Sequence, residues 1–219
     1  LVTLADRLAL KAHGVDELDY VVCTHAHEDH CGGLDDVIDS FKVDTLFAPY
    51  TEFDSSGAFT RFEDTAAEKG LFITVPPLGS EFTLGGAVFQ FVGPVSDWGS
   101  DLNDSSLVIR LEYGDTAFLY TGDISSAALE DCALIGGFDL GCDVLKLGHH
   151  GSSGSTDAEL LELIRPELAI ACCGEGNSYG HPHGEVVELL ASMDITLLRT
   201  DRDGTIELVS DGKTISAAA

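Results

Sequence analysis

Residues 24–30 read THAHEDH, and they directly follow an apolar run that predicts a short strand over Tyr20 to Thr24. Three imidazoles and a carboxylate within six residues are ligand types that suit zinc, iron or manganese. The candidate ligands are His25, His27, Asp29 and His30. Alternation along the chain lets the first two face one ion and the last two a second. A solvated polar loop is the alternative, but this spacing favours a metal site.

Two later motifs also follow predicted strands. The first is TGD, residues 121–123, where Asp123 can either ligate a metal or cap the helix that opens at Ser125. The second is LKLGHHGSSGS, residues 145–155, which carries His149 and His150. A histidine pair alone is more often structural, but beside the other motifs at least one of the two is predicted to be a ligand.

A third cluster, NSYGHPHGE at residues 177–185, places His181 and His183 just before a predicted helix. A histidine at this place can bind a substrate oxyanion or protonate a leaving group. Capping of the helix near Pro182 is an equally weighted structural interpretation.

The order of the motifs carries a family resemblance. HxHxDH with a following Gly-Gly, then NDSSLVIRLEYG, TGD, LKLGHHGS, NSYGHPH and RTDRDGTIEL, resembles the metallo-β-lactamase superfamily and, within it, the ComEC-like branch of a DNA-uptake channel protein and its soluble relatives. The resemblance implies an α/β fold, a four-layer αββα sandwich with two metals at one edge of its sheets, in a single domain over 1–219. It also implies that Asp123 bridges the metals and that His149 or His150 ligates the second one.

Two departures from the pattern affect the first metal site and the fold. The family begins with a β-hairpin, whereas this chain starts at about the first helix, so that hairpin is either missing or outside the given sequence. No histidine lies between His30 and His149, so the third histidine typical of lactamases is absent. Asn103-Asp104-Ser105 stands near that place, and an oxygen ligand there would favour manganese or weaken the first site.

Hydrophobic periodicity and turn residues predict the remaining elements. The pattern favours two groups of strands with helices between and after them, hence two sheets covered by helices. Helices are predicted over residues 1–12, 34–41, 156–164 and 184–191, in part of 51–70, and from residue 125 onward. Strands are predicted at DTLFAP, on both sides of the Gly85-Gly86 and Gly114-Asp115 turns, over residues 143–147 and 168–173, and around Leu197 and Ile206. RTDRDGTIEL is interpreted as a hairpin with a glycine turn.

Composition limits the partners. The 219 residues are 44% apolar and carry 11 Lys and Arg against 38 Asp and Glu, a formal net charge of −27. Such a surface repels duplex DNA, so a phosphoester or a short single-stranded nucleic acid is the expected substrate, with association with a DNA-uptake channel as a further expectation. No run approaches the roughly 20 apolar residues of a membrane helix. Six scattered cysteines are predicted to be buried thiols.

These observations predict a metal-dependent hydrolase that uses a water activated by two divalent ions, zinc or manganese, to cleave phosphodiester bonds. Asp29, Asp123 and His181 are the predicted catalytic residues. A lactamase, lactonase or thioester hydrolase is the alternative enzyme, and a catalytically weak binding module is the alternative from another class. The cytoplasm is expected for a free-standing protein, and the outside of the cytoplasm for part of a ComEC-like membrane protein.

Overall fold

The computed structural model describes residues 10–53, 55–96 and 101–217. The chain forms two compact units. The first comprises Leu1–Pro77 with Gly99–Leu107, and the second comprises Leu78–Trp98 with Val108–Ala219. Each unit is described below by itself, and the single-domain organisation over 1–219 stays a prediction.

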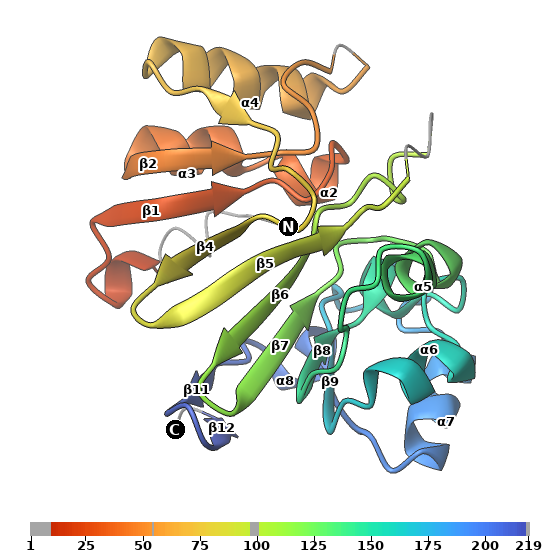
Figure 1. Ribbon diagram of the computed structural model, residues 1–219. Helices are drawn as coiled ribbons and strands as arrows, with labels where there is room; N and C mark the ends of the chain where they lie inside the picture. The colour runs from red at the N-terminus through yellow and green to blue at the C-terminus, as the bar shows by residue number, and fades with distance from the viewer. Residues whose placement is uncertain (1–9, 54, 97–100, 218–219) are drawn as a thin grey trace. The chain divides into compact units, whose positions relative to one another are not determined.

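The first unit is a small parallel sheet with helices (Figure 1). Its strands, in the order β1-β2-β3, are β1 (Glu17–Val22), β2 (Lys42–Phe47) and β3 (Ile73–Thr74), and its helices are α2 (Glu28–Cys31), α3 (Leu34–Ser40) and α4 (Gly57–Glu68). Phe59 and Phe62 of α4 pack with Ile38 of α3 and Leu46 of β2 in one buried cluster. This core fixes the carboxyl end of β1, from which residues 24–30 continue.

The second unit is a seven-stranded mixed sheet in the order β10-β9-β8-β7-β6-β5-β4. Strands β4 to β7 pair antiparallel, and β7 to β10 pair parallel. The strands are β4 (Glu81–Leu84), β5 (Ala87–Gly93), β6 (Val108–Tyr113), β7 (Thr116–Tyr120), β8 (Val144–Lys146), β9 (Leu168–Ala171) and β10 (Thr196–Arg199), and a separate pair is formed by β11 (Leu208–Ser210) and β12 (Ile215–Ala217).

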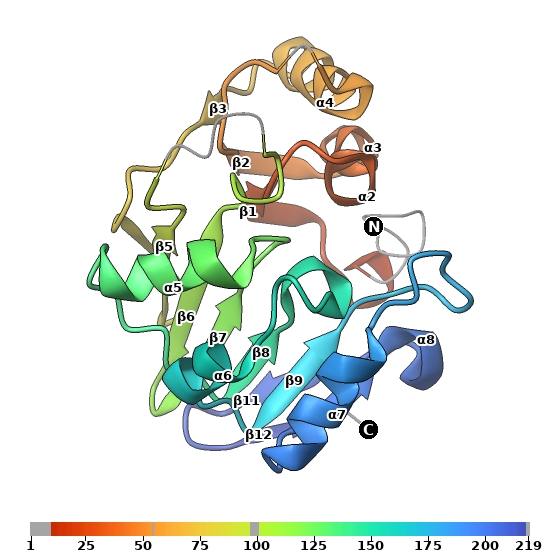
Figure 2. The same cartoon turned by 90° about the vertical axis from the view of Figure 1, so that its right-hand side faces the viewer.

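Three helices cover one face of this sheet, as Figure 2 shows. They are α5 (Ser126–Leu134), α6 (Ala158–Ile164) and α7 (Gly184–Ser192), with a 3₁₀ turn, η1 (Gly148–Gly151), and a short helix, α8 (Thr200–Asp203), elsewhere in the unit. Alternate strand residues such as Leu119 and Leu145 point toward the helices and pack with Leu161 in a buried core. Because β7, β8 and β9 are parallel, the loops after their carboxyl ends meet at one sheet edge.

Most predicted elements are confirmed, including both glycine-turn hairpins and the α/β class. Most of the helix predicted over 1–12 lies outside the described residues. Residues 10–12, the described part of it, are helical. The hairpin predicted for RTDRDGTIEL is wrong, because β11 pairs with β12 and not with β10. The Arg199 amide donates to the Asp203 carboxylate (2.7 Å), and this bond closes the helical turn α8 at the end of β10.

Candidate functional site

In the first unit, the two histidines of the HxH motif approach each other closely. His25 Nε2 lies 3.0 Å from His27 Nδ1. Two nitrogens bound at about 2.05 Å to one tetrahedral zinc lie roughly 3.3 Å apart, so this pair is close to the separation that a shared metal requires. The structure therefore brings together the two residues predicted to face one ion.

Hydroxyl groups support His25 from its other side. Its Nδ1 lies 3.2 Å from Thr24 Oγ1 and 3.2 Å from Ser106 Oγ. The amide of Leu107 donates to the Thr24 carbonyl (2.9 Å), which anchors the segment 101–107 beside the motif. The sequence drew attention to Asn103-Asp104-Ser105 here, but the hydroxyl contact to His25 comes from the next residue, Ser106.

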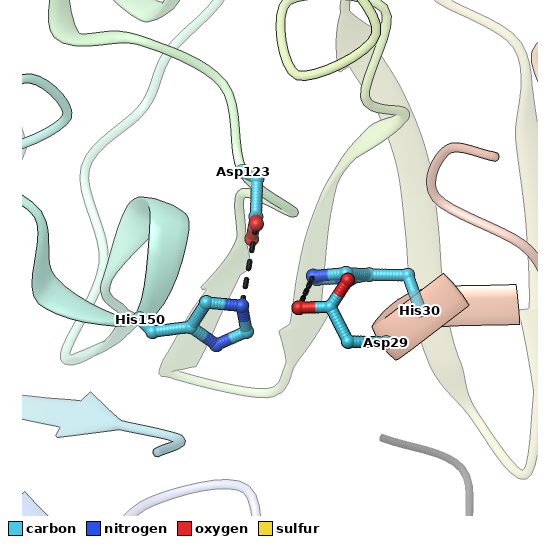
Figure 3. Close-up of side chains that lie close together, drawn as sticks. All are labelled: Asp29, His30, Asp123 and His150. Carbon is cyan, nitrogen blue, oxygen red and sulfur yellow. Dashed lines mark ion pairs between the residues drawn. The ribbon is translucent and has the colours of Figure 1, made fainter. Parts of the chain in front are cut away.

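The second half of the motif forms its own pair. Asp29 Oδ2 lies 3.9 Å from His30 Nε2, as drawn in Figure 3. His30 Nδ1 lies 3.3 Å from Thr24 Oγ1, and its ring lies 4.1 Å, centroid to centroid, from that of His25. Thr24 thus contacts two of the candidate ligands, which is a supporting role that the sequence motif did not suggest.

In the second unit, Asp123 follows β7 and is 2% exposed. Its Oδ2 lies 3.3 Å from His150 Nε2, the other pair drawn in Figure 3. The helix-cap interpretation of Asp123 is wrong, because Ser125 is the N-cap of α5 and accepts from the Ala128 amide. Asp123 therefore does not cap this helix.

The histidine pair of η1 is held in an unusual backbone conformation. His149 and His150 have φ angles of 45° and 57°, in the left-handed region that non-glycine residues rarely adopt. His150 Nδ1 lies 2.7 Å from the carbonyl oxygen of Cys172, which can only accept, so this nitrogen carries the proton. Nε2 of a neutral His150 consequently presents its lone pair toward Asp123.

His181 lies among the other histidines of this unit. Its ring centroid is 5.2 Å from that of His149 and 4.8 Å from that of His183. Burial, followed by the charges of the neighbouring histidines, lowers the pKa of His181, so it is neutral at neutral pH. His183 is the N-cap residue of α7 without a side-chain cap bond, and its Nδ1 accepts from the Ser153 amide (3.1 Å).

Lys146, the last residue of β8, contacts the turn that carries Asp123. Its Nζ donates to the carbonyls of Gly122 (2.7 Å) and Leu147 (3.0 Å) and lies 3.6 Å from Asp123 Oδ1. Thr121 Oγ1 also donates to the Lys146 carbonyl (2.8 Å). Lys146 therefore ties the TGD turn to β8 and is not an open contact for a nucleic-acid backbone.

The residues present suit divalent metal ions. Imidazole nitrogens and carboxylate oxygens are the donors that zinc and manganese take, and each of Asp29, His30, Asp123 and His150 offers one ligand atom. The close approach of His25 Nε2 to His27 Nδ1 and the fixed Nδ1 proton of His150 both match ligand geometry.

Comparison with known proteins agrees with the motif order. Residues 3–175 match the metallo-beta-lactamase superfamily. The chain is 34% identical over 198 residues to ComE operon protein 3 of Bacillus subtilis, covering 90% of this chain and 25% of that protein. It is 31% identical over 199 residues to competence protein ComA of Neisseria gonorrhoeae, covering 91% and 26%. The chain thus spans about a quarter of these relatives.

Among solved structures, CmlA, a diiron β-hydroxylase from Streptomyces venezuelae, aligns with a TM-score of 0.53 at 12% identity, covering 84% of this chain and 44% of that one. This likeness concerns the fold alone. Within the described residues, no helix has both the length and the hydropathy to span a membrane. The fold and the divalent-metal binding that it implies are those expected from the motifs, and the chain belongs to the metallo-beta-lactamase superfamily, with ComEC-like competence proteins as relatives.

Proposed function

We propose that this chain is a metal-dependent hydrolase that cleaves phosphodiester bonds in short single-stranded nucleic acids or small phosphoesters. The observation that carries the proposal is the Asp123–His150 pair, 3.3 Å apart, in which Nδ1 of His150 donates to the Cys172 carbonyl and Nε2 faces Asp123. A buried carboxylate beside an oriented imidazole is a metal half-site, and the family membership supports its use in hydrolysis.

The proposed ligands divide between two divalent ions, zinc or manganese. His25 and His27 would hold one ion, Asp29, His30 and His150 would hold the other, and Asp123 would serve both, as the family resemblance implies. Of the η1 pair, His150 is the ligand, because its Nε2 faces Asp123, whereas His149 supports His181 through its ring. Bound divalent ions would supply a water of lowered pKa and neutralise charge on a scissile phosphate.

The chain's own residues then bind and orient the substrate. Asp29 and Asp123 would accept a proton from the attacking water. Their negative charges would also stabilise bound cations. His181, neutral because its pKa is lowered, presents a ring N–H as a hydrogen-bond donor to a phosphate oxygen. The lowered pKa favours this oxyanion-binding role over that of a cationic acid for the leaving group.

Charge limits the length of the proposed substrate. Many of the described cationic side chains already pair with carboxylates: Lys42, Arg61, Lys69, Arg110, Lys146 and Arg199. A net charge of −27 then leaves little to track a long polyanion. A short single strand is therefore the preferred nucleic-acid substrate, and the competence relatives support this nucleic-acid connection and an association with DNA uptake.

The test combines metal analysis with hydrolysis assays. Purified protein is stripped with a chelator, reloaded with Mn²⁺ or Zn²⁺, and assayed on bis(p-nitrophenyl) phosphate, a short single strand, a duplex, a β-lactam, a lactone and a thioester. We expect near two metals per chain and metal-dependent cleavage of the first two substrates. Selective turnover of the lactam, lactone or thioester would contradict the phosphodiester assignment, and metal binding without any turnover would favour a binding module.

A matched pair of variants tests the residue assignment. Asp123→Asn removes the charge and one ligand atom, so we expect loss of metal-dependent turnover by at least about 100-fold. Asp115→Asn makes the same chemical change at an exposed turn and should behave as wild type. Unchanged turnover in the first variant would exclude the role proposed for Asp123.

A further inference from the structure

The segment Arg199–Asp203, RTDRD, has no role in the chemistry proposed above, yet it is highly ordered by its own contacts. The Arg199 guanidinium donates to both carboxylate oxygens of Asp201, at 2.9 Å from Nε and 2.7 Å from Nη2. The Arg199 amide donates to Asp203 Oδ2 (2.7 Å). A bidentate pair and a closing backbone bond make a rigid turn at the carboxyl end of β10.

Thr200 is the residue through which this turn contacts the neighbouring strand. The pairing of β9 with β10 ends at Arg199 and Ala171. Beyond that point, the Thr200 hydroxyl accepts from the Cys173 amide (2.8 Å) and donates to the Cys173 carbonyl (2.8 Å). One side chain thereby bonds to both backbone groups of Cys173 beyond the end of the ladder.

The two cysteines after β9 bond to different neighbours. Cys173 bonds to Thr200, which follows β10, whereas Cys172 bonds to His150, which follows β8. The Cys172 carbonyl lies 2.7 Å from His150 Nδ1. Fixing Cys173 from one side therefore fixes the acceptor that orients His150 on the other.

We propose that Thr200 is a positioning residue for His150: its hydroxyl fixes Cys173, so that the Cys172 carbonyl holds the proton of His150 on Nδ1 and directs Nε2 to the metal. This inference rests on the proposed role of His150 as a ligand. Loss of the Thr200 hydroxyl should loosen the imidazole without removing any ligand. Replacing a partner of a metal-ligating histidine costs about 10- to 100-fold in metal affinity, and we expect about 10-fold for Thr200, which acts one residue further away.

The test uses Thr200→Val, which removes the hydroxyl at nearly constant shape, and Thr200→Ser, which restores it. Thr196→Val makes the same change at an exposed position of β10, the strand that precedes Thr200. Zn²⁺ affinity is measured by competition with a chromophoric chelator, and Co²⁺-loaded protein is compared by its visible spectrum. We expect about 10-fold weaker binding and an altered spectrum for Thr200→Val, and wild-type behaviour for the other two.

Nuclear magnetic resonance of the metal-free protein separates this inference from the proposed function. The His150 Nδ1 proton, assigned by its loss in His150→Gln, should resonate downfield in wild type and Thr200→Ser and exchange faster in Thr200→Val. If Thr200→Val does not fold, Asp201→Asn, which weakens the turn, should show the same change to a smaller degree. The inference would be overturned if the wild type showed no protected Nδ1 proton, or if a folded Thr200→Val variant kept the proton exchange rate and the metal affinity of wild type. Either result would overturn it even if hydrolysis were confirmed. An absence of hydrolysis alone would not overturn it.

Discussion

Replacing Lys146 by methionine should strongly destabilise the metal-free protein. Asp123 is 2% exposed, and the Lys146 ammonium lies 3.6 Å from its Oδ1. Removing one partner of a buried ion pair costs about 3–5 kcal/mol, because it leaves a buried charge without compensation. The Lys146 side chain is 18% exposed, which admits some water, so we expect a loss of about 3 kcal/mol in the free energy of unfolding. Urea unfolding followed by circular dichroism in the presence of a chelator measures it.

A double-mutant cycle separates this charge effect from lost packing. Lys146→Met combined with Asp123→Asn removes both charges. The double variant should therefore lose about 2 kcal/mol less in the free energy of unfolding than the two single variants lose together. Lys213→Met, at an exposed turn, is the control and should lie within about 0.5 kcal/mol of wild type. A loss below about 1 kcal/mol for Lys146→Met, or no coupling in the cycle, would refute this account of the Asp123 environment.

Three further predictions follow from the second unit. Burial raises the pKa of Cys132 and Cys142 to about 12, so both thiols should resist iodoacetamide at pH 8 until the protein is unfolded, and mass spectrometry showing native alkylation would contradict this. Gly151→Ala should cost about 2 kcal/mol or more in urea unfolding, because φ is +89° and the new Cβ would lie 2.6 Å from Pro182 Cβ; a neutral change would exclude this close approach. Burial lowers the pKa of His181, so the unfolded chain binds a proton at this residue more readily than the folded chain does. The metal-free protein should therefore lose stability as the pH falls below about 6.5. The His181→Gln variant should lose less stability over the same pH range.

The fold was predictable where periodicity and turn chemistry act locally. Gly85 and Gly86 have positive φ angles, and the sequence placed a hairpin across them correctly. The end of the chain was not predictable in this way, because Gly204 suggested a hairpin while the contacts of Arg199 with two later aspartates close a helical turn instead. The ion pair of Arg199 with Asp201 and the bond from the Arg199 amide to Asp203 stabilise this turn, and hydrophobic pattern alone does not predict such contacts.

The candidate ligands were visible in the sequence because metal chemistry restricts them to a few residue types. Their supports were less visible. Ser106 contacts His25 although 81 residues separate them, and the bond from the Leu107 amide to the Thr24 carbonyl helps to hold the segment there. Lys146 belongs to the LKLGHHGSSGS motif, but its sequence position does not show that its ammonium bonds to the TGD turn.

The orientation of His150 shows why such supports escape motif analysis. Its Nδ1 partner is the backbone carbonyl of Cys172, and any residue type would supply that oxygen. The side chain at position 172 is therefore uninformative, and the requirement for a fixed carbonyl passes to Thr200, which bonds to the next residue along the strand. In this proposal, a threonine that follows one strand orients an imidazole that follows another, because successive backbone groups of the chain between them bond to both. On this proposal, the orientation of His150 depends on the ladder of β8, β9 and β10 as well as on the side chains that would bind a metal.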